Sequence, residues 1–206
     1  MDDYKEIFKL AVVSCITILV LSFGKDQAAR LVLQNKLSAA LEAPVKLSNL
    51  SIGFWHHRIV AQGLRVYDPD GFPEEIILDI PQVTADYDFE ALLKRKLVLY
   101  ELHLNVRRLI VSEDTENQLN VNVLTRTLRT EKAAGIHFKV DNLYVTIGKV
   151  IYRPRALAGD KFQTFEVGIK EKNLKNVENL EILLKFILLE ALKSTSIKGI
   201  AIYYDR

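Results

Sequence analysis

The side chains that could carry chemistry are scarce, and their spacing suits neither catalysis nor metal binding. Histidines stand at His56, His57, His103 and His137. Neighbours on a strand point to opposite faces, so His56 and His57 are poorly placed to share a metal ion. The sequence contains no HExxH spacing, no G-x-S-x-G nucleophile elbow and no glycine-rich phosphate loop. We therefore expect satisfied or exposed histidines, with no catalytic residues, no metal site and no cofactor.

The acidic pairs are better suited to turns and surfaces than to general acid–base catalysis. Asp68 and Asp70 belong to the segment DPDGFP, and Glu74 and Glu75 follow it directly. Proline presets φ and glycine supplies a positive φ, so the segment has the composition of a tight turn. The residues with this predicted structural role are Asp68, Pro69, Gly71 and Phe72.

Charge argues against one large class of function. The 206 residues carry a formal net charge of +2, whereas a nucleic-acid footprint needs lysine and arginine gathered on one face. Two short basic clusters occur, Lys94-Arg95-Lys96 and Arg107-Arg108. Solvated charge on a loop or a strand edge is the main interpretation, and contact with anionic lipid headgroups is the alternative. No nucleic-acid partner is expected.

An apolar segment near the N-terminus determines where the rest of the chain is predicted to lie. Residues Ile7 to Phe23 read IFKLAVVSCITILVLSF, with Lys9 as the one charge. A helix needs about 17–25 apolar residues to cross a bilayer, and its backbone must be hydrogen-bonded internally. We therefore predict a transmembrane anchor over residues 1–24 and a membrane as partner. The predicted anchor residues are Ile7, Phe8, Leu10, Val12, Val13, Ile16, Ile18, Leu19, Val20, Leu21 and Phe23.

Three alternatives to the anchor stay open. A cleaved signal peptide needs a basic start and a small-residue cleavage site, whereas this chain begins MDDYKE. A lipoprotein signal is formally matched by Val12-Val13-Ser14-Cys15, although the apolar run continues well beyond Cys15. The third alternative is a buried core helix. Lysine and arginine flank both sides of the segment, so charge does not decide its orientation.

Beyond the anchor, the hydrophobic period indicates a helix and then a β-rich domain. Apolar residues recur at helical spacing over 25–43, which predicts a helical stalk that ends at Pro44. From there the period becomes two, which is typical of half-buried strands. A nearly all-apolar helix is predicted over 176–193. The predicted strands cover 45–54, 59–67, 76–89, 98–111, 136–152, 165–169 and 197–204, with short helices over 89–94 and 120–129.

The predicted fold class is α+β. A transmembrane helix and stalk are followed by a domain over 44–206, with a mixed or mostly antiparallel curved sheet and the C-terminal apolar helix packed on it. Segment 45–53 resembles 138–148, because both read apolar-x-apolar-x-Asn-Leu and then reach a glycine. This likeness predicts a two-part repeat over 44–130 and 131–206.

Several segments resemble a known family. They are the apolar helix and stalk, then Ala43-Pro44-Val45-Lys46-Leu47, Gly63-Leu64-Arg65-Val66, the Asp68–Phe72 turn, Asp88–Val98 and Asn142–Val150. Together they are similar to the amino-terminal module of AsmA-like proteins of the AsmA/TamB type. The resemblance implies a bacterial inner-membrane anchor, a periplasmic domain and a role in outer-membrane and envelope lipid homeostasis. Large relatives resemble bridge-like lipid-transfer proteins with an apolar groove for acyl chains, whereas this chain has the length of one or two modules.

Two classes of function follow from these patterns. In the first, an apolar sheet face binds or transfers lipid acyl chains. In the second, the core is closed, no lipid binds, and a membrane-anchored scaffold contacts other envelope proteins, with unpaired strand edges available to them. Alternation alone does not distinguish the two, because a closed core and a lipid groove have the same period.

The lipid hypothesis places its contacts on the longest predicted strand. Its predicted apolar face comprises Val98, Tyr100, Leu102, Leu104 and Val106. Under this hypothesis, Leu102→Glu should abolish lipid retention and leave the domain folded. The candidate lipid-facing residues are Tyr100, Leu102, Leu104, Phe138 and Val140.

Overall fold

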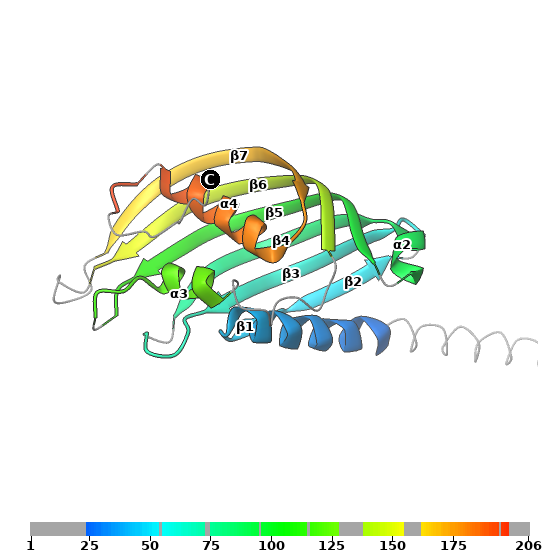
Figure 1. Cartoon of the computed structure of the whole chain (residues 1–206), viewed down its shortest axis with the longest axis horizontal. Helices are drawn as coiled ribbons and strands as arrows, with labels where there is room; N and C mark the ends of the chain where they lie inside the picture. Colours follow the sequence, from blue (N-terminus) through cyan, green and yellow to red (C-terminus); the bar gives the residue numbers. More distant parts are fainter. Residues whose placement is uncertain are drawn as a thin grey trace, which may run out of the picture.

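One curved β-sheet is the framework of the molecule, and its longer helices lie along it (Figure 1). The computed structural model describes residues 24–53, 55–72, 75–94, 96–114, 116–127, 138–154, 162–193 and 195–197. The strands are β1 (Val45–Lys46), β2 (Asn49–Gly53), β3 (Arg58–Tyr67), β4 (Ile76–Tyr87), β5 (Leu97–Ser112), β6 (Phe138–Arg153) and β7 (Gln163–Val177). The helices are one over residues 24–41, α2 (Phe89–Leu93), α3 (Asn120–Thr127) and α4 (Leu180–Lys193).

The seven strands follow the order β1-β3-β4-β5-β6-β7, and β2 pairs with β3 on the same edge as β1. Neighbouring strands are antiparallel except β5 and β6, which are parallel. Parallel neighbours need a crossover connection, and this one contains α3. The predicted α+β class and mostly antiparallel curved sheet agree with this arrangement. The two repeat-like segments differ in position, since 45–53 supplies two short edge strands and 138–148 lies within the long strand β6.

The predicted membrane anchor needs correction. Among the residues that the structure describes, no helix combines the length and the apolar character that crossing a membrane requires. The helix at this end, over 24–41, carries Lys25, Asp26, Arg30 and Lys36. This finding contradicts the predicted N-terminal transmembrane helix and the predicted single-pass localisation in a bacterial inner membrane. The predicted anchor residues from Ile7 to Phe23 lie outside the described residues.

The helix over 24–41 is docked on the sheet and is not a free stalk. The Ile52 amide donates to Asp26 Oδ1 at 3.2 Å and the Leu47 amide to Gln34 Oε1 at 3.2 Å. Arg30 Nη1 in turn donates to the Leu47 carbonyl at 2.8 Å, and Figure 1 shows the helix lying along β1 and β2. An edge strand exposes unpaired backbone groups, so these side chains satisfy the edge that β1 and β2 would otherwise present.

A bulge in β5 changes the predicted face of the longest strand. Asp86 pairs with Glu101 and Tyr87 with Leu99, so Tyr100 is an extra residue. Side chains before the bulge therefore change face. Leu99 is buried in place of Val98, and Tyr100 is 49% exposed. The predicted alternation is correct from Leu102 to Val106 and wrong before the bulge.

A second irregularity of the sheet involves glycines on β3, β6 and β7. Gly63 on β3 has φ of 64° and lies between the register pairs that flank Pro81 on β4. Gly148 on β6 approaches β5 so closely that a Cβ would lie 2.7 Å from the Arg107 carbonyl oxygen. On β7, Gly168 has φ of 61° where the register with β6 shifts. Bulges and glycines bend strands and increase twist, which accounts for the curvature seen in Figure 1.

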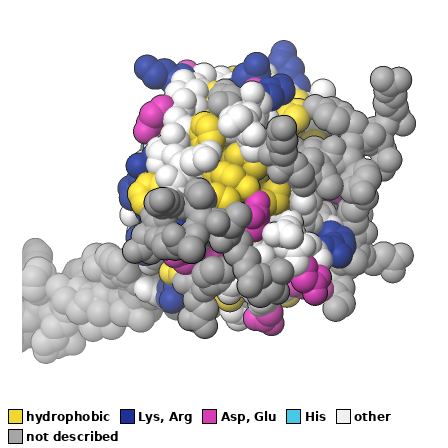
Figure 2. All heavy atoms as spheres, turned by 90° about the vertical axis from the view of Figure 1, so that its left-hand side faces the viewer, with side chains coloured by type: hydrophobic (Ala, Val, Ile, Leu, Met, Phe, Trp, Pro, Cys, Tyr) yellow, Lys and Arg dark blue, Asp and Glu magenta, His cyan; other side chains and the backbone are white. Residues whose placement is uncertain are grey.

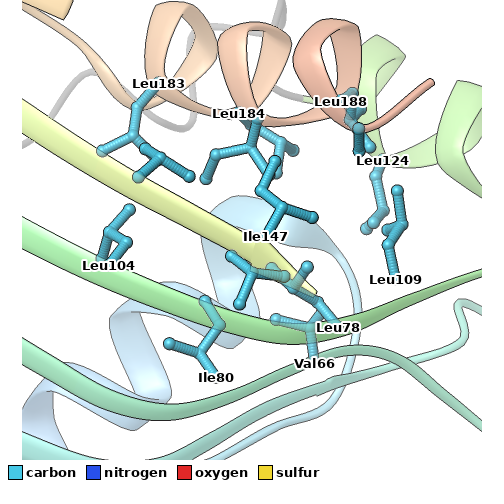
Figure 3. Packing of buried hydrophobic residues seen from close by; sticks show 14 of the residues in the cluster. Val66, Leu78, Ile80, Leu104, Leu109, Leu124, Ile147, Leu183, Leu184 and Leu188 are labelled. Carbon is cyan, nitrogen blue, oxygen red and sulfur yellow. The ribbon is translucent and has the colours of Figure 1, made fainter. Parts of the chain in front are cut away.

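The hydrophobic core lies between the sheet and the helices on one of its faces, which we call the helix-covered face. Figure 3 shows Leu183, Leu184 and Leu188 of α4 above Leu104 and Ile147 of the sheet. The helix over 24–41 extends this cover toward β3, where Leu33 packs against Leu50 and Ala61. The opposite face, which we call the open face, carries Arg65 and His103, whose side chains are 46% and 45% exposed, and Tyr144, which stacks on His103.

Candidate functional site

The structure places the predicted lipid-facing residues in different environments. Leu102 and Leu104 are each 6% exposed and Val140 is fully buried. Phe138 is partly buried against the same cluster. Tyr100 is half exposed, because the bulge in β5 turns it away from the core. These five residues therefore do not line one open groove.

The predicted turn is present, and its first residue has a second role. The Phe72 amide donates to the Pro69 carbonyl at 3.3 Å, and Gly71 has φ of 95°. Asp68, in contrast, is buried, and its Oδ1 accepts a 2.8 Å hydrogen bond from Asn120 Nδ2 at the start of α3. Asp68 thus joins the β3–β4 connection to the crossover between β5 and β6.

Burial raises the pKa of the Asp68 carboxyl from its ordinary value of 3.8 to about 6. The hydrogen bond from Asn120 favours the charged carboxylate and opposes this shift, and the nearby Glu75 adds to it. The folded protein therefore holds the Asp68 proton more tightly than the unfolded chain does. Between about pH 4 and pH 6, this group lowers the free energy of unfolding as the pH rises.

We expect Asp68→Asn to remove that contribution, because an asparagine oxygen still accepts from Asn120 and no longer ionises. The variant should gain stability relative to the wild type as the pH rises from 4 to 6, by at most about 3 kcal/mol, and the difference should stay constant above pH 7. Urea unfolding of both proteins between pH 4 and pH 8 measures this difference. A difference that does not change over this range would contradict the shifted titration of Asp68.

Two of the three described histidines, His57 and His103, stack on aromatic rings, and the third, His56, is exposed. His57 stacks on Phe89 at a ring-centroid distance of 5.4 Å, and His103 stacks on Tyr144 at 4.7 Å. Within the described ranges, no group of three or more His, Cys, Asp or Glu side chains is placed to hold a metal ion. His137 lies outside these ranges.

A shallow polar depression lies around the His103–Tyr144 stack. Its volume is about 210 Å³. The Glu171 amide donates to Thr146 Oγ1 at 3.3 Å, and Gln82 Nε2 donates to Thr84 Oγ1 at 3.3 Å. A ring face beside hydroxyl and amide groups can bind a polar ligand. The lining residues are Gln82, Thr84, His103, Leu104, Asn105, Tyr144, Thr146 and Glu171.

Three arginines surround one buried carboxylate beside this depression. Asp79 on β4 is buried, and its oxygens lie 3.7 Å from Arg65 Nε, 3.5 Å from Arg107 Nη1 and 3.5 Å from Arg108 Nε. Asp79 faces Arg65 and Arg108 in the sheet register. We call these four residues the arginine cluster. Together with the depression, it makes the open face the strongest candidate for a binding surface.

Only part of this surface can be recognised from the sequence. The Arg107-Arg108 pair is visibly basic, but Asp79 and Arg65 lie far from it along the chain. A signal for Asp79 exists in the segment IILDIP, where one carboxylate interrupts an apolar strand. A charge in such a position is costly unless it is paired, so the segment indicates positive charges on the neighbouring strands.

Comparisons with known proteins identified no relative of this chain. No protein-family model matches the chain, and no curated protein or solved structure matches it either. The resemblance to AsmA-like proteins therefore stays a prediction from the sequence.

Proposed function

We propose that this protein is an interaction module with a closed core, which holds no lipid and contacts its partners through the open face and the β7 edge. The observation that carries the proposal is the burial of Leu102, Leu104 and Val140, three of the residues that a lipid groove would need to expose. A buried apolar face under α4 leaves acyl chains no obvious surface there. Partners would then bind the polar surfaces of the open face, which are the depression and the arginine cluster.

The outer edge of β7 supports the same proposal. Within the described ranges, β7 pairs with β6 and with no other strand. Its free backbone groups can accept an extended segment of a partner. Irregular residues limit this edge, since Glu171 and Asn176 have positive φ values of 46° and 55°, which is a common way to restrict uncontrolled pairing.

Lipid handling is the second candidate, and one observation favours it. Figure 2 shows hydrophobic side chains visible at the end of the molecule that lies on the left in Figure 1, with charged side chains around them. An acyl chain that entered the core would find an apolar surface there.

Native mass spectrometry of the full-length chain, combined with solvent extraction of bound lipids, separates the two candidates. We expect a mass that corresponds to the protein alone and no stoichiometric lipid in the extract, because the core is filled by side chains. A stoichiometric lipid that survives purification would reject the closed-core proposal and support lipid handling. A Leu93→Glu variant, which adds a charge at an exposed residue of α2, is the control for lipid that adheres non-specifically to the protein surface.

A further inference from the structure

The charges of the arginine cluster do not cancel. Arg65, Arg107 and Arg108 share the single carboxylate of Asp79, whose side chain is only 3% exposed. A guanidinium carries its charge at every physiological pH. The cluster therefore holds more positive than negative charge, and the guanidiniums remain partly open to solvent.

The neighbouring strands add to this excess of positive charge. In the sheet register, Lys46 on β1 faces Arg65, and Lys149 on β6 faces Arg108. Lys46 Nζ lies over the ring of Tyr67, 5.0 Å from the ring centroid. The next acidic residue in the row is Glu166 on β7, which faces Lys149. Like charges on facing strands are unfavourable, so the row would be stabilised by a bound anion.

The guanidinium donors of the cluster are also poorly used. The contacts to Asp79 are 3.5–3.7 Å long, beyond the usual length of a charge-assisted hydrogen bond. On the same sheet, Arg58 binds Asp86 through two hydrogen bonds of 2.6 and 2.9 Å. Arg108 Nε is buried and has no hydrogen-bond acceptor. Because Arg108 Nε is buried, the donors available to a ligand are those of the partly exposed guanidiniums, above all Arg65 and Arg107, which are 46% and 60% exposed.

We propose that Arg65, Arg107 and Arg108 bind a phosphate group, with Asp79 holding the three side chains in place. Phosphate carries several acceptor oxygens and up to two negative charges, and the planar guanidinium donates to it in pairs. The group is a phosphate monoester, borne either by a soluble molecule or by a lipid headgroup. This inference goes beyond the proposed function, because it does not depend on whether the core is closed.

The adjoining depression provides room for the rest of such a ligand. Asn105 lies two residues before Arg107 on β5, and Gln82 on β4 is its register partner. Beyond them, His103 and Tyr144 present their stacked rings. A polar group attached to the phosphate would meet amide donors and an aromatic surface at this place.

The test is a calorimetric titration of the full-length protein with inorganic phosphate, alongside co-sedimentation with two kinds of vesicle. One vesicle is phosphatidylcholine alone, and the other contains phosphatidic acid in addition. We expect saturable binding of phosphate, weakened at least about tenfold in both Arg107→Gln and Arg108→Gln. Arg107 is 60% exposed and Arg108 is 36% exposed, so Arg107→Gln should have the smaller effect on folding, which circular dichroism checks.

Arg58→Gln is the matched control, because it removes one guanidinium from the same sheet outside the cluster and should leave phosphate binding unchanged. Binding of inorganic phosphate, with no sedimentation on vesicles that contain phosphatidic acid, identifies a soluble ligand. Sedimentation that requires phosphatidic acid and is lost in Arg107→Gln identifies a headgroup. The proposal is overturned if neither probe binds, or if binding survives equally in both cluster variants.

Discussion

Replacing Leu102 with glutamate is expected to unfold the protein, in contrast to the outcome expected for a lipid groove. Leu102 is 6% exposed, and its register partners are Ala85 on β4 and Leu143 on β6, both of which are buried. A carboxylate at this position would be surrounded by apolar side chains with no partner. Burying an unpaired charge and losing the leucine contacts should together cost about 4 kcal/mol or more.

Such a loss is a large part of the total stability of a domain, which is about 5–15 kcal/mol. Urea unfolding followed by circular dichroism at pH 7 measures it. We expect a midpoint shifted strongly toward zero urea, or no folded protein at all. Leu93→Glu is the control, because Leu93 on α2 is 71% exposed and the change should alter stability by about 0.5 kcal/mol or less. A Leu102→Glu protein with the wild-type midpoint would show that water reaches this face, and the closed core would be wrong.

The strand pattern of the sheet could be predicted because the long strands alternate buried and more exposed side chains over much of their length. From Leu102 to Val106 on β5, the predicted alternation coincides with the buried side chains. The bulge at Tyr100 could not be predicted, since one extra residue leaves a sequence that still alternates acceptably on either side. The register with β4, which only the folded sheet defines, decides where the alternation changes face.

The docking of the helix over 24–41 on the sheet could not be predicted, for a different reason. Its residues Asp26, Arg30 and Gln34 are of the types found on a solvated helix face. In the structure, they bind backbone groups of the edge strands. A polar side chain that satisfies another strand's backbone cannot be distinguished by type from one that contacts water.

The candidate site on the open face could not be predicted from the sequence, for a similar reason. Arg65, Asp79 and Arg108 are far apart along the chain, and only the antiparallel pairing of β3, β4 and β5 brings them into one row. Whether the core is closed likewise depends on where α4 packs, because alternation reports which side of a strand is apolar and not what covers it.

The largest pH-dependent effect is expected for Asn120→Asp. Asn120 is fully buried, and its Nδ2 donates to Asp68 Oδ1 at 2.8 Å and to the Ile110 carbonyl at 3.1 Å. Its Oδ1 accepts from the amides of Ser112 at 3.2 Å and Val121 at 2.8 Å. Aspartate keeps the shape and the two accepted bonds but replaces the donor with an oxygen, which then faces two acceptors.

At pH 8, the substitution places two carboxylates in contact in a buried site, and we expect a loss of about 3–5 kcal/mol in the free energy of unfolding. Like charge and burial both raise the pKa of such a pair in the folded state. The folded variant therefore binds a proton that the unfolded chain releases, and stability must increase as the pH falls through the folded pKa. The bound proton also restores a donor between the two side chains, so much of the loss should be recovered near pH 5.

Urea unfolding at pH 8 and pH 5 tests this expectation, with Asn49→Asp as the control for an added carboxylate on the exposed part of the edge strand β2. The control should change little at either pH. If the Asn120→Asp protein is as stable as the wild type at pH 8, or gains nothing at pH 5, then Asp68 and Asn120 do not share a buried hydrogen bond. The β3–β4 turn and the crossover helix α3 would then have to be held together by apolar packing alone.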